Sequence, residues 1–221
     1  MKHRLLRLLV PALVLSILTV TNAQEQKPGR NPRADAICGS PNGQTLKCPR
    51  LAFDYKIPFG WVDRTSDMQI GEMQAEAAPN ADANKAAYAS SSKSQTLLAI
   101  FERPPAVPGE TINSAVVIAA ESVADYHALK QASDYFGPIS ELAEQRGFKA
   151  VSEPYAFSVG ARRLVRADFS KERGKLTMWQ SSLVMIEKGY IVSFTFVGGS
   201  EDDVADLVTN LSFASKAQPH K

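Results

Sequence analysis

Three strand patterns lie one after another in the second half of the chain, and they constrain its fold more than any other feature. Residues 161–169 and 190–197 alternate between two faces, and residues 175–187 form a longer strand pattern between them. Alternation with a period of two is typical of strands with one buried face. Turns at Glu172-Arg173-Gly174 and Glu187-Lys188-Gly189 separate the three strands, so we expect them to pair as an antiparallel meander.

Further strand and helix patterns surround this meander. Ser122 with Asp125 resembles a capping pair, and Pro138 suits the first turn of a helix. Ser200, followed by three acidic residues, is typical of a helix start. We therefore expect strands at 51–57, 96–102, 113–120 and, irregularly, 149–157, and helices at 122–133, 138–147 and 200–211. Helices placed between runs of antiparallel strands predict an α+β sandwich.

The first 23 residues have the layout of a secretory signal peptide. Three basic residues give a positive start, an apolar stretch of about 13 residues follows, and Thr21-Asn22-Ala23 is a small-residue exit. A membrane anchor is the alternative, but a helix that spans a bilayer needs about 20 apolar residues. We predict cleavage near Ala23, a secreted or periplasmic location, and no stable membrane span after cleavage.

Cleavage would also change the charge of the chain. The full sequence carries 25 Lys and Arg against 23 Asp and Glu, a net charge of +2. The signal segment holds three of the basic residues and none of the acidic ones, so the mature chain would have a net charge of −1. No general attraction to nucleic acid follows, and we expect no nucleic-acid partner.

Cys38 and Cys48 are the two cysteines of the chain, and a turn-forming run at residues 39–43 lies between them. In an oxidising compartment two cysteines this close most simply form one disulfide. Such a bond would stabilise the fold by about 3 kcal/mol through the unfolded chain. Free thiols are an alternative, whereas a metal site would need two further ligands that the neighbouring sequence does not supply.

The predicted organisation of the chain has one folded domain. Segment 24–50 is rich in Pro and Gly and poor in large aliphatic residues, which predicts a flexible lead-in that contains the disulfide loop. Within the domain, an Ala-rich insert predicts a surface loop or a loosely held helix. The divisions are a signal peptide at 1–23, the lead-in at 24–50, a single α+β domain at 51–213 with the insert at 68–93, and a tail at 214–221.

Two short motifs give the domain a resemblance to a known family. A strand that ends in Ile57-Pro58-Phe59-Gly60-Trp61, and a meander followed by a helix that ends in Leu211-Ser212-Phe213, are similar to those of PsbP-like domains. The resemblance implies a central antiparallel sheet of about six to seven strands with helices on both faces. It also implies an accessory or binding protein, since the family includes a Ran-binding nuclear factor and bacterial envelope proteins. The N-terminal extension and the Ala-rich insert depart from the photosynthetic members, so their role is not carried over.

The sequence has no motif that marks a known catalytic or cofactor site. A nucleophile elbow, a phosphate-binding loop and a zinc-protease motif are all absent. His127 is the one His in the body of the domain, where a surface position on a helix fits better than the role of a catalytic base. We therefore expect no catalytic residue, no cofactor and no metal ligand.

Two features suggest contacts with a partner. Basic side chains concentrate on the strand from residue 162 and on its turn, where they could bind an anionic ligand or an acidic partner, or could only protect a strand edge. Two aromatic residues just beyond a strand end could anchor a partner or pack on the sheet. The candidate partner-binding residues are Phe59, Trp61, Arg162, Arg163, Arg166 and Arg173.

These observations together predict an exported, soluble, non-catalytic binding or accessory protein of the cell envelope, with an envelope protein as its partner. The alternative is a periplasmic small-molecule binder or an enzyme of an unrecognised type. A deep pocket with convergent polar groups would favour the alternative.

Overall fold

The computed structural model describes residues 37–39, 41–77, 94–105 and 110–214. The predicted signal peptide, most of the lead-in, the second part of the Ala-rich insert and the tail after Ala214 lie outside these residues. In the part of the chain that is described, no helix is both long enough and apolar enough to cross a membrane.

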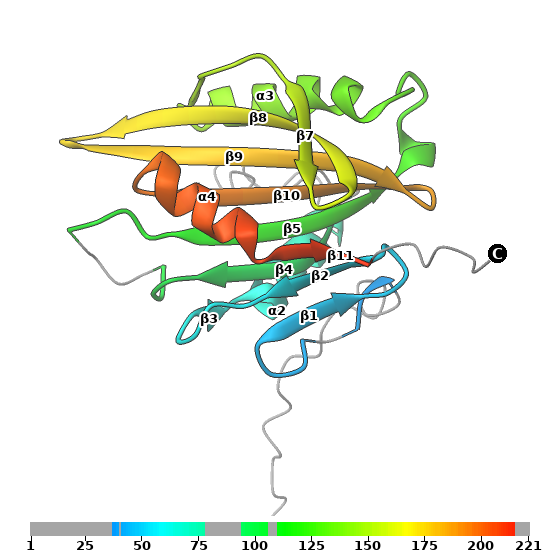
Figure 1. The fold of residues 1–221 in the computed structure, drawn as a ribbon, viewed down its shortest axis with the longest axis horizontal. Helices are drawn as coiled ribbons and strands as arrows, with labels where there is room; N and C mark the ends of the chain where they lie inside the picture. The colour runs from blue at the N-terminus through cyan, green and yellow to red at the C-terminus, as the bar shows by residue number, and fades with distance from the viewer. Residues whose placement is uncertain (1–36, 40, 78–93, 106–109, 215–221) are drawn as a thin grey trace, which may run out of the picture.

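One antiparallel sheet of eight strands forms the centre of the fold, as Figure 1 shows. Its order is β3 (Val62–Asp63), β4 (Gln95–Phe101), β5 (Ala115–Ser122), β10 (Tyr190–Gly198), β9 (Leu176–Glu187), β8 (Arg162–Arg173) and β6 (Lys149–Ala150), and β7 (Tyr155–Val159) also pairs with β8. The α+β class and the antiparallel sheet predicted from the sequence are confirmed. The sheet has one strand more than expected because the irregular stretch after residue 148 forms two short strands on the β8 edge.

The predicted meander is β8, β9 and β10. Glu187 pairs with Tyr190, so the β9–β10 turn has two central residues. Lys188 and Gly189 both have positive φ, at 46° and 83°, which is the conformation of the type I′ turn that matches the twist of paired strands. The turn fixes which side chains face each other across the meander.

A second sheet covers one face of the first. It contains β1 (Thr45–Cys48), β2 (Phe53–Lys56) and β11 (Leu211–Phe213). Fully buried Phe53 packs edge-on against Phe194 of the large sheet, with ring centroids 5.1 Å apart. The residues predicted as the end of the last helix, Leu211-Ser212-Phe213, therefore form a strand.

The disulfide loop belongs to the folded domain, which corrects the predicted boundary at Leu51. Cys38 and Cys48 are bonded, with their Cα atoms 4.4 Å apart. Leu46 and Cys48 have no exposed surface, because β1 pairs with β2 and turns these side chains into the core. The few apolar residues of the lead-in are the ones that are buried, and the low average hydrophobicity of the segment hid them.

Helices cover both faces of the large sheet. In Figure 1, α3 (Phe136–Gln145) lies on the far face, while α4 (Glu201–Thr209) and β7 lie on the near face. Ser200 caps α4 by accepting a 3.0 Å hydrogen bond from the Asp203 N–H, as predicted. Val204, Leu207 and Val208 of α4 join the core beneath the helix.

The helix predicted at 122–133 does not form. Two short 3₁₀ turns, Val123–Asp125 and Ala132–Tyr135, stand in its place. The Asp134 carboxylate accepts hydrogen bonds from the Lys130 and Gln131 N–H groups, which stabilises an irregular path. The next helix begins at Phe136, so that Pro138 lies in its first turn as predicted.

The Ala-rich insert begins with a helix that closes the edge of the sheet. This helix, α2 (Thr65–Ala77), packs against β4. The Gln69 side chain donates to the Thr96 carbonyl over 2.7 Å, and the Glu72 carboxylate accepts from the Thr96 N–H over 3.2 Å. The Thr65 hydroxyl accepts from the Ala99 N–H over 2.9 Å. Polar side chains thus satisfy strand groups that would otherwise be exposed, whereas the sequence predicted a loop or a loosely held helix.

Candidate functional site

A cavity of about 230 Å³ lies between β7 and α4 on the near face of the large sheet (Figure 1). We call it the β7–α4 pocket. Its lining comes from the link between β6 and β7, from β7, β8 and β9, and from the start of α4: Val151, Ser152, Tyr155, Arg166, Asp168, Trp179, Gln180, Ser181, Glu201 and Val204.

The strand register brings the polar residues of this pocket together. Arg166 and Asp168 lie two positions apart on β8 and therefore share a face. Asp168 pairs with Ser181 of β9, and Arg166 pairs with Tyr155 of β7. Gly198 lets the first turn of α4 come close to the sheet, since a Cβ there would lie only 2.8 Å from the Cβ of Asp203.

Asp168 is the centre of the polar floor. Its carboxylate accepts a 2.8 Å hydrogen bond from the Tyr155 hydroxyl and another of 2.8 Å from the Arg166 Nε. The Ser181 hydroxyl also donates to Asp168, and it accepts a 2.9 Å bond from the Arg166 Nη2. The side chains of Arg166 and Asp168 are only 16% and 17% exposed. Charge-assisted bonds at this depth hold the four side chains in one arrangement.

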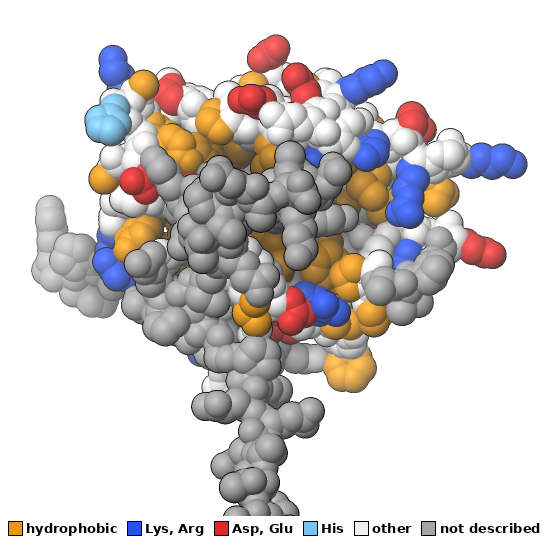
Figure 2. Space-filling model, turned by 180° about the vertical axis from the view of Figure 1, so that it is seen from behind, with side chains coloured by type: hydrophobic (Ala, Val, Ile, Leu, Met, Phe, Trp, Pro, Cys, Tyr) orange, Lys and Arg blue, Asp and Glu red, His pale blue; other side chains and the backbone are white. Residues whose placement is uncertain are grey.

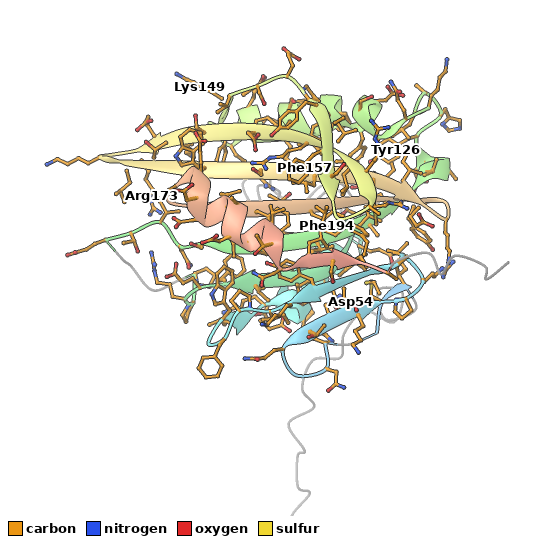
Figure 3. All side chains as sticks on the ribbon, in the orientation of Figure 1. Asp54, Tyr126, Lys149, Phe157, Arg173 and Phe194 are labelled. Atoms are coloured by element: carbon orange, nitrogen blue, oxygen red, sulfur yellow. A yellow bond between two sulfur atoms is a disulfide. The ribbon has the colours of Figure 1, made fainter. Side chains whose placement is uncertain are left out.

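The surroundings of Arg166 and Tyr155 reinforce this arrangement. The guanidinium carbon of Arg166 lies 5.0 Å from the ring centroid of Phe157, the β7 residue labelled in Figure 3. Burial raises the pKa of the Tyr155 hydroxyl, and its hydrogen bond to Asp168 raises it further. The charges of Asp168 and Glu201 act in the same direction, while Arg166 acts against them. Tyr155 therefore remains a protonated donor at neutral pH.

The rim of the pocket is exposed and partly apolar. Val151 is 51% exposed and Tyr155 is 39% exposed. The Ser152 hydroxyl oxygen is buried and has no hydrogen-bond partner among the described residues. The Glu201 side chain is exposed at the start of α4. The site thus combines a fixed polar floor with an accessible edge.

Only one of the predicted basic residues, Arg166, lies in this pocket. Arg162 forms a 2.6 Å ion pair with Glu187 and lies over the Phe213 ring, so its charge is already matched. Arg163 and Arg173 are exposed, and the alternation of β8 places them on its other face. Arg173 stands at the end of β8, remote from Phe157 in Figure 3. The basic residues therefore do not form one patch.

The far face of the molecule shows the same dispersal of charge. In the part of it that the described residues form, Figure 2 shows basic and acidic side chains interspersed along the rim. Lys171, another member of the predicted cluster, donates a 2.6 Å hydrogen bond to the Arg146 carbonyl at the end of α3. Its role at that position is to cap a helix.

The two predicted aromatic residues have different surroundings. Phe59 is 91% exposed in the loop between β2 and β3, whereas Trp61 is half-buried and packs against the core. Phe59 therefore remains available for a contact, and it is not part of the β7–α4 pocket.

A second cavity, of about 430 Å³, lies near Tyr126 and Tyr135 on the opposite face. It is open, and its lining is mostly apolar. Buried Glu121 accepts hydrogen bonds from the hydroxyls of both tyrosines, at 2.6 Å from Tyr135. Because these polar groups satisfy one another, they offer little to orient a ligand. Exposed His127 lies at its rim.

The chemistry of the β7–α4 pocket is that of binding. Its lining contains no His or Cys, and the Ser181 hydroxyl donates its proton to a carboxylate that accepts two further hydrogen bonds. Such a carboxylate is a weak base, so Ser181 is not activated as a nucleophile. No group of three His, Cys, Asp or Glu side chains within the described ranges is arranged to hold a metal ion.

Sequence comparisons supply no relative. No protein-family model matches the chain, and a search of curated proteins finds no match.

Solved structures do match, at low sequence identity. PsbP (CyanoP) of the cyanobacterium Synechocystis sp. PCC 6803 is 12% identical with a TM-score of 0.43, over 80% of this chain and 98% of its own. The Ran-binding protein Mog1p of Saccharomyces cerevisiae is 12% identical with a TM-score of 0.38, over 77% of this chain and 84% of its own. LpqN of Mycobacterium tuberculosis, described as involved in cell envelope biogenesis, is 12% identical with a TM-score of 0.34, over 72% and 76%. The predicted resemblance to PsbP-like proteins is thereby confirmed as a likeness of fold.

Proposed function

We propose that this protein is an exported, non-catalytic binding protein of the cell envelope, and that it recognises another envelope protein through the β7–α4 pocket. The observation that carries the proposal is an exposed apolar rim above a rigid polar floor. Val151 and Tyr155 supply the rim, and Asp168, held by three donors, supplies the floor.

The size of the pocket favours a protein partner over a small molecule. Pockets that enclose a drug-sized ligand typically measure about 300–1,000 Å³, and this one measures about 230 Å³. That volume suits one inserted side chain. Protein interfaces concentrate their binding energy in such anchors, each set in a well-packed pocket and surrounded by apolar contacts.

Two observations support the export of the protein. The N-terminal 23 residues have the layout of a signal peptide. The Cys38–Cys48 disulfide is buried in the core between the sheets, and such structural disulfides persist in oxidising compartments outside the cytosol.

Site-specific photo-cross-linking in cells of the source organism tests the proposal. A photoreactive phenylalanine analogue would replace Val151 in the full-length protein, with the same replacement at Leu176 as the control. Leu176 is also an exposed apolar residue, but it lies outside the pocket lining. We expect one defined envelope protein to be cross-linked from position 151 and not from position 176. The same products from both positions, or none from position 151, would refute the proposal.

A further inference from the structure

The charges that line the β7–α4 pocket leave it negative. Arg166 and Asp168 neutralise each other across 2.8 Å. Glu201 has no hydrogen-bond or ion-pair partner among the residues that the structure describes. The partial positive charge at the start of α4 offsets only part of a full carboxylate charge. The pocket therefore favours a cationic group over an anionic one.

The hydrogen-bonding capacity left in the pocket is mostly that of acceptors. The hydroxyl protons of Tyr155 and Ser181 are both donated to Asp168, and two nitrogens of Arg166 are bonded to the floor. The oxygen lone pairs of Tyr155, one lone pair of Asp168 and the carboxylate of Glu201 remain available. The orphaned Ser152 hydroxyl can also accept. A ligand that fits must bring the donors.

The remaining walls suit an alkyl chain. Val204 is buried, Trp179 is half-buried, and Val151 lies at the entrance. A lysine side chain packs its methylene groups on apolar surface and carries three donors at its tip. The nearby aromatic ring adds a favourable contact for a cation.

From these features we infer that the β7–α4 pocket binds the ammonium group of a lysine side chain on the partner protein. The inference rests on the proposed function of the same pocket and names the group that this pocket selects. In the complex, Glu201 and Asp168 accept hydrogen bonds from the ammonium group, and Val151 and Trp179 contact its stem.

An NMR titration of the purified exported protein tests the inference. The probe is Nα-acetyl-lysine methylamide, and the control is the same compound acetylated on its side-chain nitrogen, which has no charge. We expect the charged probe to shift the amide resonances of Ser152, Asp168 and Glu201 with a millimolar dissociation constant, and the acetylated compound to leave them unchanged. Equal shifts with both compounds, or none with the charged probe, would overturn the inference.

Two matched variants separate the pocket from general charge. Glu201→Gln removes the unpaired carboxylate, while Asp202→Asn removes the same charge one position along α4, outside the pocket lining. We expect Glu201→Gln to weaken binding of the charged probe by about five-fold or more, and Asp202→Asn by less than about two-fold. Equal weakening would show that only the overall charge attracts the probe.

Two other outcomes assign the failure. If cadaverine binds about a hundred-fold more tightly than the lysine probe, the pocket is a site for a free diamine, and the inference of a partner lysine is wrong. If the probe does not bind but position 151 still cross-links to one envelope protein, the lysine assignment fails and the proposed function stands. If the probe binds without any cross-link, the proposed function fails, and with it the assignment to a partner's lysine.

Discussion

The Tyr155 hydroxyl donates a 2.8 Å hydrogen bond to the carboxylate of Asp168, and this bond joins the short edge strand β7 to the long strand β8 at the floor of the pocket. Strand pairing alone aligns Tyr155 with Arg166. The side-chain bond therefore adds a diagonal link, which fixes the position of the pocket wall relative to its floor.

Tyr155→Phe should lower the free energy of unfolding by about 1 kcal/mol, because it removes one hydrogen bond to a charged acceptor at a partly exposed position. Urea denaturation measures the change. Tyr190→Phe is the matched control, since no hydrogen bond of the Tyr190 hydroxyl is present in the described part of the chain. Equal losses in the two variants would show that the Tyr155–Asp168 bond contributes nothing.

Replacing both Cys38 and Cys48 with Ala should destabilise the domain by about 3 kcal/mol, since the unfolded chain would lose the constraint of the closed loop. A reducing agent should have a similar effect on the wild-type protein and none on the double variant. The measurement is urea denaturation with and without the reductant. A wild-type domain that keeps its stability after complete reduction would contradict the expectation.

Glu72→Ala should destabilise the fold by about 1–3 kcal/mol, because the Thr96 N–H would lose its acceptor at the edge of the sheet. An unsatisfied strand edge also favours association, so we expect this variant to form oligomers in size-exclusion chromatography. Ser66→Ala, in the first turn of the same helix, is the control and should leave both properties unchanged. A monomeric Glu72→Ala protein of wild-type stability would refute the role assigned to α2.

The fold should lose stability in alkaline solution. Burial raises the pKa of both Tyr55 and Tyr135 above the ordinary value of about 10, and the Glu121 carboxylate adds to the effect on Tyr135. Above about pH 10 the unfolded chain releases these protons and the folded chain retains them, so the free energy of unfolding must fall as the pH rises.

Urea denaturation between pH 8 and pH 11.5 measures this dependence. Stability should stay level with respect to these two groups below about pH 9 and then decrease, and Tyr55→Phe should reduce the slope. A slope unchanged in Tyr55→Phe would show that this hydroxyl does not contribute.

The sequence predicts the meander well and the second sheet poorly, for physical reasons. Long alternating strands linked by Gly-containing turns carry their own pairing information, and β8, β9 and β10 form as expected. β1 and β11 have four and three residues, and their burial depends on β2, which is remote from β11 in the sequence. So little alternation cannot be distinguished from a loop.

The site shows the same division. Asp168 and Ser181 could have been paired from the sequence, since Arg173 pairs with Leu176 across the β8–β9 turn and the register counts back from there. Tyr155 could not have been placed, because β7 returns to β8 after an irregular link that contains Pro154. The basic residues of β8 were grouped by their distance in sequence, although strand alternation sends them to opposite faces.

The central claim is that the β7–α4 pocket is the surface that binds the partner, and an affinity measurement tests it most directly. The partner recovered by cross-linking would be titrated calorimetrically with the wild-type protein, with Val151→Asp, and with Phe59→Ser, which alters the other strongly exposed apolar side chain. The account predicts that Val151→Asp weakens binding by about ten-fold or more, as expected for a change at an anchor site, and that Phe59→Ser changes it by less than about two-fold. Full affinity in Val151→Asp together with a large loss in Phe59→Ser would place the interface on the β2–β3 loop and contradict the account.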